Sequence, residues 1–277
     1  MKPPPFDYIQ VDTTEEAVDL LAEYGEDARI LAGGQSLMPM LNMRLLRPQI
    51  LIDINQISDL KLLEEKKNNI EIGATITQGE LEDWPRLSSV APILSMAIPS
   101  IGHFQTRNRG TVCGSICHAD PSSELPTCLM LLDGEVELRS KRKKRRVVAK
   151  DFLKGVLTTA KRPDELVTRV LFPKANDKTF FAFTEFHHRH GDFAVVGIAG
   201  VSIENKIKLA VGGVADKPET REWVDLKGDA IDDALNEFAW DLRGSDDIHA
   251  TAQYRRELVR HLGRKIIDQL AEQKSNG

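Results

Sequence analysis

Two glycine-bearing segments of the 277-residue chain carry the residue types that bind phosphate groups. The first, residues 31–37 (LAGGQSL), places Gly33 and Gly34 directly after an apolar stretch and Ser36 two residues later. Adjacent glycines let a backbone approach a ligand closely and point successive N–H groups into one concavity, where the Ser36 hydroxyl adds a donor. The third glycine of a Rossmann fingerprint and the G-K-[S/T] of a P-loop are missing, so this segment alone is also typical of a plain turn.

The second segment, residues 107–121 (RNRGTVCGSICHADP), again combines glycines with hydroxyl side chains at Gly110, Thr111, Gly114 and Ser115. Asp120 and Pro121 predict a helix start that brings Glu124 into the first turn. A carboxylate there could accept hydrogen bonds from ribose or ribityl hydroxyls, or it could complement the helix dipole. Together the two segments suggest a ligand that has phosphates and a sugar-like polyol.

Several cysteines and histidines invite interpretation as a metal site, but their spacing does not support it. Metal and iron–sulfur sites use four ligands at spacings such as C-x2-C, and the chain lacks them, so we interpret the cysteines as buried packing residues. His187 and His188 are adjacent, and adjacent side chains on a strand point to opposite faces, so these two cannot easily share a metal ion. We therefore expect surface or hydrogen-bonding roles for them. No nucleophile–base pair, G-x-S-x-G or H-E-x-x-H motif is present, so we predict no catalytic residue and no metal ligand, and assign the chemistry to a cofactor. The residues considered are Cys113, Cys117, His118, Cys128, His187, His188 and His190.

The elements that must position the glycine segments alternate between helices and strands in the first part of the chain. Thr13 and Glu16 have capping-box spacing and Gly25 is a terminal glycine, which predicts a helix over residues 13–24. Thr77 and Glu80 predict another helix start. We expect strands over residues 29–31, 50–54, 70–76, 134–139 and 166–172, and helices over residues 88–98 and 120–133.

After Pro173 the sequence changes to consecutive strands followed by helices. Residues 180–186, 194–203 and 206–211 predict strands, the last two joined by a turn at Glu204 and Asn205. Helical sequence runs from Asp229 to the end, with a long polar helix from about Asp246. Because runs of strands followed by helices favour a separate α+β domain, we divide the chain into residues 1–175 and 176–277.

The composition is that of an ordinary globular protein, with 41% hydrophobic and 29% charged residues. A net charge of −5 gives no general attraction to nucleic acid, and we interpret the basic run over residues 141–146 (KRKKRR) as a solvated hairpin tip. No apolar segment reaches the ~18 residues that a membrane helix needs. The odd number of cysteines argues against a secreted disulfide framework, so we expect a cytoplasmic protein without a membrane span.

Four segments, found in family order along essentially the whole chain, resemble the FAD-binding medium subunits of molybdenum hydroxylases. The carbon monoxide dehydrogenase medium chain and the xanthine dehydrogenase flavin domain belong to this family. The segments are residues 28–41 (ARILAGGQSLMPML), 107–126 (RNRGTVCGSICHADPSSELP), 189–197 (RHGDFAVVG) and 209–218 (LAVGGVADKP).

The resemblance implies an α+β fold. Residues 1–175 would form a two-part FAD-binding domain of the vanillyl-alcohol-oxidase (PCMH) type, and residues 176–277 a smaller C-terminal domain of antiparallel strands packed on helices. Ala32 to Ser36 and Thr111 to Ser115 would wrap the FAD pyrophosphate. Glu124 would lie near the polyol and Val167 near the adenine. Ile101 would lie near the flavin, and Phe193 over the isoalloxazine. The cofactor-binding residues implied by position are Ala32, Gly33, Gly34, Gln35, Ser36, Ile101, Thr111, Gly114, Ser115, Glu124, Val167 and Phe193.

Two positions depart from the family pattern. The second motif of the family is T-I-G-G-[S/N], and Cys113 replaces its first glycine, which would strain the backbone if that position needs a positive φ. Some relatives also place a lysine near the flavin in the strand at Thr184 or Glu185, and neither residue is a lysine here.

The resemblance also implies partner chains and a role. An iron–sulfur small subunit with [2Fe–2S] clusters and a large subunit with the molybdenum cofactor would assemble with this chain as a dimer of heterotrimers. This chain would pass electrons from the iron–sulfur subunit to an external acceptor, and no nucleic acid partner is expected. Two other functions stay open: a self-contained FAD-dependent oxidase or dehydrogenase, which would need acid/base residues over the flavin, and a nucleotide-binding module without redox function.

Overall fold

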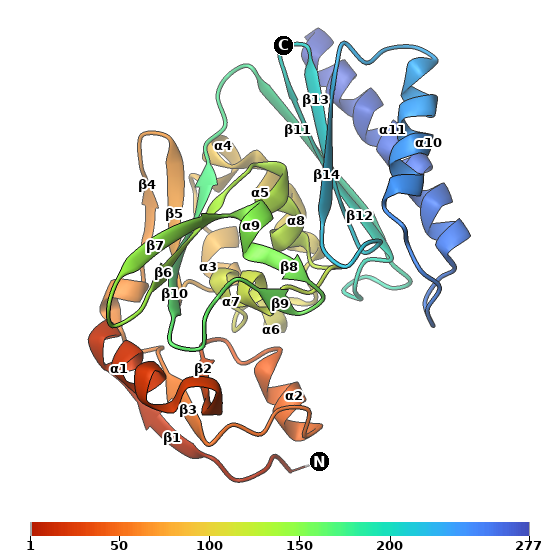
Figure 1. Ribbon diagram of the computed structural model, residues 1–277. Coiled ribbons are helices and arrows are strands. Elements are labelled where there is room, and N and C mark those ends of the chain that lie inside the picture. The colour runs from red at the N-terminus through yellow and green to blue at the C-terminus, as the bar shows by residue number, and fades with distance from the viewer. Residues whose placement is uncertain (1, 277) are drawn as a thin grey trace.

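A computed structural model describes residues 2–276, which form three lobes that follow one another along the chain (Figure 1). The N-terminal lobe, residues 7–53, is a small parallel sheet in the order β1-β3-β2 with helices packed beside it. Parallel strands need crossover connections, and the helix α1 supplies the one between β1 and β2. The elements are β1 (Asp7–Gln10), α1 (Thr14–Tyr24), the 3-10 helix η1 (Gly25–Asp27), β2 (Ala28–Leu31), α2 (Leu37–Asn42) and β3 (Ile50–Asp53).

The middle lobe, residues 58–173, is an antiparallel sheet in the order β4-β5-β10-β6-β7 with helices beside it (Figure 1). Its strands are β4 (Leu63–Glu65), β5 (Asn69–Gly73), β6 (Glu135–Arg139), β7 (Lys144–Val148) and β10 (Leu166–Pro173), with the separate pair β8 (Leu153–Gly155) and β9 (Thr158–Thr159). Its helices are η2 (Ser58–Leu60), α3 (Gln78–Glu82), α4 (Leu87–Val90), α5 (Pro92–Ala97), η3 (Ile98–Ser100), α6 (Phe104–Arg107), α7 (Val112–His118), α8 (Glu124–Leu131) and α9 (Ala149–Phe152).

The C-terminal lobe, residues 179–276, is a four-stranded antiparallel sheet with two long helices against one face (Figure 1). The other face of the sheet packs on α5 and α8 of the middle lobe, so β12 is buried on both sides and lacks polar alternation. The elements are β11 (Thr179–Phe186), β12 (Val196–Ile203), β13 (Lys206–Gly212), β14 (Glu219–Val224), α10 (Ala230–Asp241) and α11 (Ala252–Asn276).

Two hydrophobic cores hold these lobes together. The larger one joins the N-terminal and middle lobes and includes residues of the C-terminal sheet such as Phe181 and Val201. The smaller one fills the space between the C-terminal sheet and α10 and α11, around Leu235, Phe238 and Ile266. The lobes therefore pack on one another through apolar side chains, and this confirms the expected α+β fold with antiparallel strands on helices near the C-terminus.

Most expected helices and strands are present, with four main differences. The Asp120 carboxylate accepts a hydrogen bond from the Ser122 N–H (2.9 Å), so this segment is a turn and α8 begins only at Glu124. The single helix expected over residues 88–98 is divided, because Ala91 leaves helical geometry and Pro92 begins a new helix. The long polar helix begins at Ala252, not near Asp246, and β14 was not expected from the sequence.

The basic run lies in the β6–β7 hairpin, as expected, with residues 141–143 at its tip and the rest in β7. Acidic side chains of the same region pair with it: Lys141 Nζ lies 3.0 Å from Asp19 Oδ1, and Arg145 Nε lies 2.6 Å from Glu165 Oε1. None of the helices within residues 2–276 is long and apolar enough to cross a lipid bilayer.

Candidate functional site

The first glycine segment connects the end of β2 to the start of α2. Gly34 has φ +71°, a conformation that glycine adopts without strain, and its carbonyl accepts the Met38 N–H at 3.0 Å. The Ala32 carbonyl is held from the other side by Asn55 Nδ2 at 3.1 Å. Within residues 2–276, the backbone N–H groups of residues 33–36 have no hydrogen-bond acceptor, and the Ser36 hydroxyl caps no helix. The segment therefore presents several donors that the fold itself does not use.

The second glycine segment forms the start of α7. Thr111 is the N-cap residue, and its hydroxyl accepts a hydrogen bond from the Gly114 N–H at 3.0 Å. Gly114 is exposed and Ser115 half-buried, whereas Val112 and Cys113 face the core. The glycine and serine thus lie on the outer side of the first helical turn, the side that a ligand can reach.

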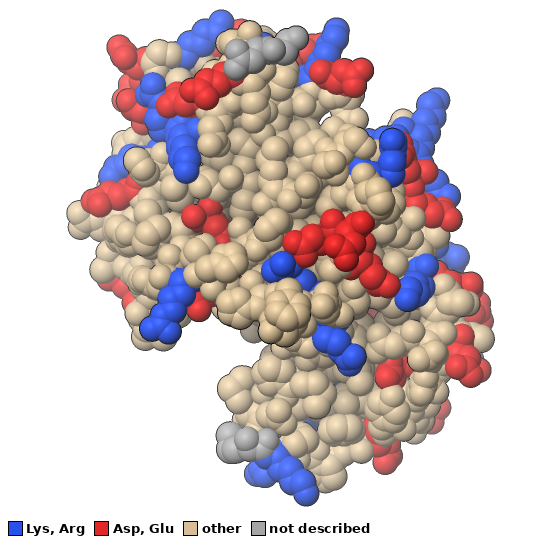
Figure 2. All heavy atoms as spheres, turned by 180° about the vertical axis from the view of Figure 1, so that it is seen from behind, with Lys and Arg blue, Asp and Glu red and all other residues tan. Residues whose placement is uncertain are grey.

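The two segments touch each other through their backbones. A Cβ atom on Gly33 would lie only 2.2 Å from the Arg109 carbonyl oxygen and 2.8 Å from the Gly110 Cα. Gly33 therefore lies against the residues that immediately precede Thr111, about 80 residues away in sequence. We call residues 33–36 and 111–115 the glycine site. Figure 2 shows an indentation of the surface between the N-terminal lobe and the rest of the molecule, on the side seen from behind.

Cysteine at position 113 fits the local backbone without strain. Its φ is not positive, since it lies inside the first turn of α7, and its thiol lies 3.4 Å from the Ile72 carbonyl oxygen. Burial raises the pKa of Cys113 well above its ordinary value and that of Cys117 to about 11, so both stay neutral thiols. Cys128 is also fully buried, in agreement with the interpretation of these cysteines as packing residues.

Within residues 2–276 no three His, Cys, Asp or Glu side chains are grouped so that they could hold a metal ion. The histidines of residues 187–190 are not on a strand, because β11 ends at Phe186. The expected alternation of their side chains was therefore wrong. His188 Nε2 lies 3.2 Å from the His249 carbonyl oxygen, which fits the hydrogen-bonding role that was expected for it.

The remaining sequence-predicted site residues lie in different surroundings. Ile101 and Val167 are 9% and 4% exposed and belong to the larger core, so each can offer a ligand only a small apolar surface. Glu124 is the first residue of α8 and is 9% exposed. Phe193, between β11 and β12, is 67% exposed. A ring that is this exposed does not pack in the core, as a phenylalanine at the start of a buried strand would.

The loop that carries Phe193 packs against the middle lobe. Gly191 has φ +89°, and a Cβ atom there would lie 2.6 Å from the His103 ring and 3.1 Å from the Gly102 carbonyl oxygen. The segment containing Ile101 and the loop containing Phe193 are therefore in direct contact. The contact joins their segments at Gly191 and His103, which belong to different lobes.

Glu185 is a polar residue of this region that the sequence did not mark as a site residue. Its side chain is 3% exposed, and neither carboxylate oxygen has a hydrogen-bond partner among residues 2–276. Burial, and then the charge of Glu124, raise the pKa of Glu185 to about 8, and burial raises the pKa of Glu124 to about 7. The resemblance pointed to position 184 or 185 only for a lysine that this chain lacks, and the burial of Glu185 depends on how the C-terminal sheet packs on the middle lobe, which is not a local property.

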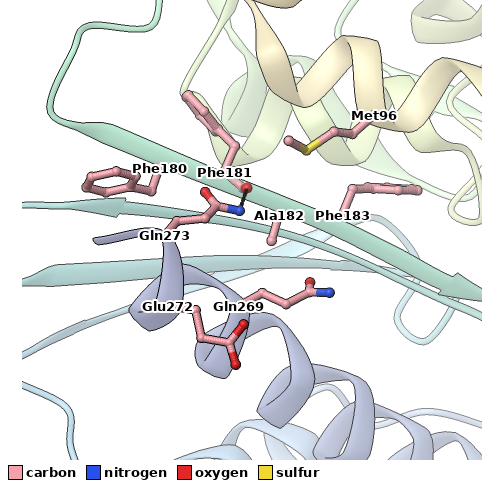
Figure 3. A pocket seen from close by; sticks show the side chains of 8 residues that line it. All are labelled: Met96, Phe180, Phe181, Ala182, Phe183, Gln269, Glu272 and Gln273. Carbon is pink, nitrogen blue, oxygen red and sulfur yellow. Dashed lines mark hydrogen bonds between the residues drawn. The ribbon is translucent and has the colours of Figure 1, made fainter. Parts of the chain in front are cut away.

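A groove among the described residues lies elsewhere. It has a volume of about 660 Å³ and opens between α5, β11 and α11, where Met96, Phe180 and Phe183 line it (Figure 3). Gln273 Nε2 donates a hydrogen bond to the Phe181 carbonyl oxygen across one wall. This groove is lined by neither of the glycine segments.

Comparison with known proteins identifies the family to which the chain is similar. The sequence family described as "FAD binding domain in molybdopterin dehydrogenase" matches residues 4–175. The chain is 37% identical to the alpha subunit of the 6-hydroxypseudooxynicotine dehydrogenase complex of Paenarthrobacter nicotinovorans, over 96% of this chain and 95% of the relative. It is 35% identical to the glyceraldehyde dehydrogenase medium chain of Sulfolobus acidocaldarius, over 98% of this chain and 100% of the relative.

Solved structures are similar over the same extent. Reconstituted CO dehydrogenase from Oligotropha carboxidovorans has a chain that superposes with a TM-score of 0.93 at 29% identity, covering 98% of this chain and 99% of that one. A chain of quinoline 2-oxidoreductase from Pseudomonas putida 86 superposes with a TM-score of 0.92 at 29% identity, covering 99% of both.

Proposed function

Because the chain belongs to the family of FAD-binding domains in molybdopterin dehydrogenases, we propose that it is the flavin electron relay of a larger assembly. As a family member it is an FAD-binding oxidoreductase subunit. Our proposal adds the direction of transfer: electrons arrive from a [2Fe–2S] subunit and leave to an external acceptor. Bound FAD supplies two-electron and one-electron chemistry in the same cofactor. The residues of this chain supply its position and electrostatic surroundings.

The observation that carries the proposal is the contact between the two glycine segments. The N–H groups of residues 33–36 have no acceptor among residues 2–276. Gly33 lies against Arg109 and Gly110, which directly precede the N-cap residue of α7. Phosphate oxygens are acceptors, so a pyrophosphate can use these donors and the positive end of α7 together. We propose that Ala32, Gly33, Gly34, Gln35 and Ser36 bind it from one side. Thr111, Gly114 and Ser115 would bind it from the other.

The rest of FAD would extend from the glycine site in two directions. Glu124 and Glu185 are buried acceptors that suit the donating hydroxyls of a polyol. We assign Ile101 and Phe193 to the flavin ring, because their segments meet at Gly191 and His103, and Val167 to the adenine. These positions hold and orient the cofactor, and none of them is proposed to attack a substrate.

We propose residues 1–175 as the FAD-binding domain and residues 176–277 as the C-terminal domain. Several relatives are named medium chains or complex subunits. We infer from this that the chain works with an iron–sulfur small subunit and a large subunit that holds the molybdenum cofactor, as a dimer of heterotrimers.

The experiment is to purify the chain alone, record its absorption spectrum, and reduce it with dithionite. We expect a flavin spectrum that bleaches on reduction, and no turnover of organic substrates with a dye acceptor until the partner chains are added. Substrate-dependent dye reduction by the lone chain would instead support a self-contained oxidase. A protein that binds nucleotides but no flavin would support a nucleotide-binding module.

A further inference from the structure

The side chain of Gln78 is buried beside the second glycine segment. Gln78 is the first residue of α3 and is 5% exposed, and its N–H donates to the Gly110 carbonyl oxygen at 2.8 Å. The preceding residue, Thr77, forms an antiparallel bridge with Thr111, so the backbone that enters α3 runs beside the start of the second segment. The place of the Gln78 side chain is therefore fixed by the backbone of that segment.

The amide oxygen of this side chain is not used by the fold. Gln78 Oε1 is buried without a hydrogen-bond partner among residues 2–276. The Thr106 carbonyl oxygen, which lies on the same side of Gly110, already accepts the Gly110 N–H at 2.7 Å. Buried polar atoms are nearly always paired, so an unpaired amide marks a place where a ligand or an ordered water binds.

The amide lies next to the contact between the two glycine segments. A Cβ atom on Gly110 would lie 3.2 Å from Gln78 Oε1 and 3.4 Å from Gln78 Cδ. A Cβ atom on Gly33 would lie 2.8 Å from the Gly110 Cα. Gly110, which has no side chain, is thus the residue between the amide and Gly33. The amide therefore lies at the edge of the glycine site.

We propose that the Gln78 side chain is a further cofactor contact of the glycine site and donates a hydrogen bond from Nε2 to a pyrophosphate oxygen of FAD. This inference rests on the proposed function, which brings the pyrophosphate to this place. A glutamine amide carries one acceptor and one donor group, and a half-turn about its terminal bond puts Nε2 in the place of Oε1. Phosphate oxygens are hydrogen-bond acceptors, so they select the donor end of the amide.

The surroundings of the amide suit an anion. The N–H groups of residues 33–36 are donors without an acceptor among residues 2–276, and the amide adds a side-chain donor from a third segment of the chain. The three atoms nearest to a Cβ on Gly110 belong to the Thr106 carbonyl group and the Gln78 amide, and none belongs to a carboxylate that would repel a phosphate. An ordered water could pair with Oε1 as well, so the test must separate a cofactor contact from a structural one.

The test is a calorimetric titration of the flavin-free protein with FAD. Gln78→Leu removes the amide, and we expect FAD to bind about 10- to 100-fold more weakly, because a hydrogen bond to a charged group is lost. Gln78→Glu keeps the shape of the side chain but replaces the donor with a negative charge, so binding should be weaker still. Gln273→Leu is the matched control. Its Nε2 donates to the Phe181 carbonyl oxygen at 2.9 Å in the C-terminal lobe, so the FAD affinity should stay unchanged.

Unchanged FAD affinity in Gln78→Leu would overturn the inference even if that variant is less stable, since the amide would then have only a structural role. If Gln78→Leu does not fold, the Gln78→Glu variant decides: affinity equal to that of the unchanged protein would show that the side chain acts as an acceptor, which contradicts a phosphate contact. The phosphorus NMR signals of bound FAD should also shift in Gln78→Glu and stay in place in Gln273→Leu. If the unchanged protein binds FAD and both Gln78 variants bind it equally well, the inference fails and the proposed function stands. If the unchanged protein binds no FAD, the proposed function fails, and this inference fails with it.

Discussion

The backbone contact between the two glycine segments predicts a large effect for the smallest substitution, Gly33→Ala. The new Cβ atom would lie 2.2 Å from the Arg109 carbonyl oxygen, where ordinary contacts begin at 3.4 Å. Both neighbours, Arg109 and Gly110, present backbone atoms, so no side chain can rotate away. The two segments must therefore separate by about 1 Å, which opens the glycine site.

Overpacking of this kind costs about 1 to 3 kcal/mol. For a protein of this size each kcal/mol lowers Tm by about 2 to 4 °C, so we expect Gly33→Ala to lower the Tm of the flavin-free protein by about 2 to 12 °C. FAD retention should fall as well, because the donors of residues 33–36 move away from α7. Calorimetry and the flavin-to-protein absorbance ratio measure the two effects.

Two further glycines make the test specific. At Gly155 an added methyl group would meet no atom within 4 Å, and φ is not positive, so Gly155→Ala should change the free energy of unfolding by less than about 0.5 kcal/mol. Gly114→Ala would place Cβ 2.7 Å from Thr111 Oγ1, whose capping bond is worth about 1 kcal/mol, so its effect should be intermediate. If Gly33→Ala behaves like Gly155→Ala in both measurements, the two segments are not in the tight contact that we describe.

Three other predictions concern the cofactor and the buried acids. Acid denaturation should release FAD into the supernatant, since no covalent link is expected, and a yellow pellet would contradict this. Phe193→Ala should alter flavin fluorescence while leaving the Tm of the flavin-free protein unchanged, because the ring is 67% exposed. A lower Tm with an unchanged flavin spectrum would show that the ring packs in the core and does not cover the flavin. Burial raises the pKa of Glu185 from an ordinary 4.5 to about 8, so the folded chain binds more protons than the unfolded chain between these values. The free energy of unfolding, from urea titrations, should therefore fall as the pH rises from about 5 to about 8, by roughly 2 kcal/mol after allowance for water near the site. Glu185→Gln should flatten this dependence, and an equally steep curve would show that another group is responsible.

Local sequence signals predicted the elements that begin and end by their own chemistry. The capping box at Thr77 and Glu80 is present, and so is the Thr13 cap with the terminal Gly25. The strand β14 was missed because its side chains are polar and only partly buried, and its extended shape comes from pairing with β13. Strand pairing between distant segments overrides local preference in such edge strands.

The candidate site, like the fold, was predictable only where its residues carry a local signal. Both glycine segments could be found from their residue types, but the reason for Gly33 was misplaced. Its missing side chain was attributed to a ligand phosphate, whereas in the structure the Arg109 and Gly110 backbone occupies that space. Glu185 depends on the register of β11 against β12 and on the packing of that sheet on α8, neither of which is a local property.

The C-terminal lobe therefore helps to build the region assigned to the flavin. The Gly213 N–H donates to the Pro121 carbonyl oxygen at 2.8 Å, in the turn that precedes Glu124 and α8. Arg255 of α11 holds this loop and the loop after Phe193 together, through the Gly213 and Val195 carbonyl oxygens at 2.5 and 2.7 Å. One buried guanidinium thus supports both loops, so we expect a substitution of Arg255 to loosen the two together. The proposed pyrophosphate site of this chain lies in the first two lobes, but its surroundings still depend on the third, which supplies Glu185 and supports the segments of Glu124 and Phe193.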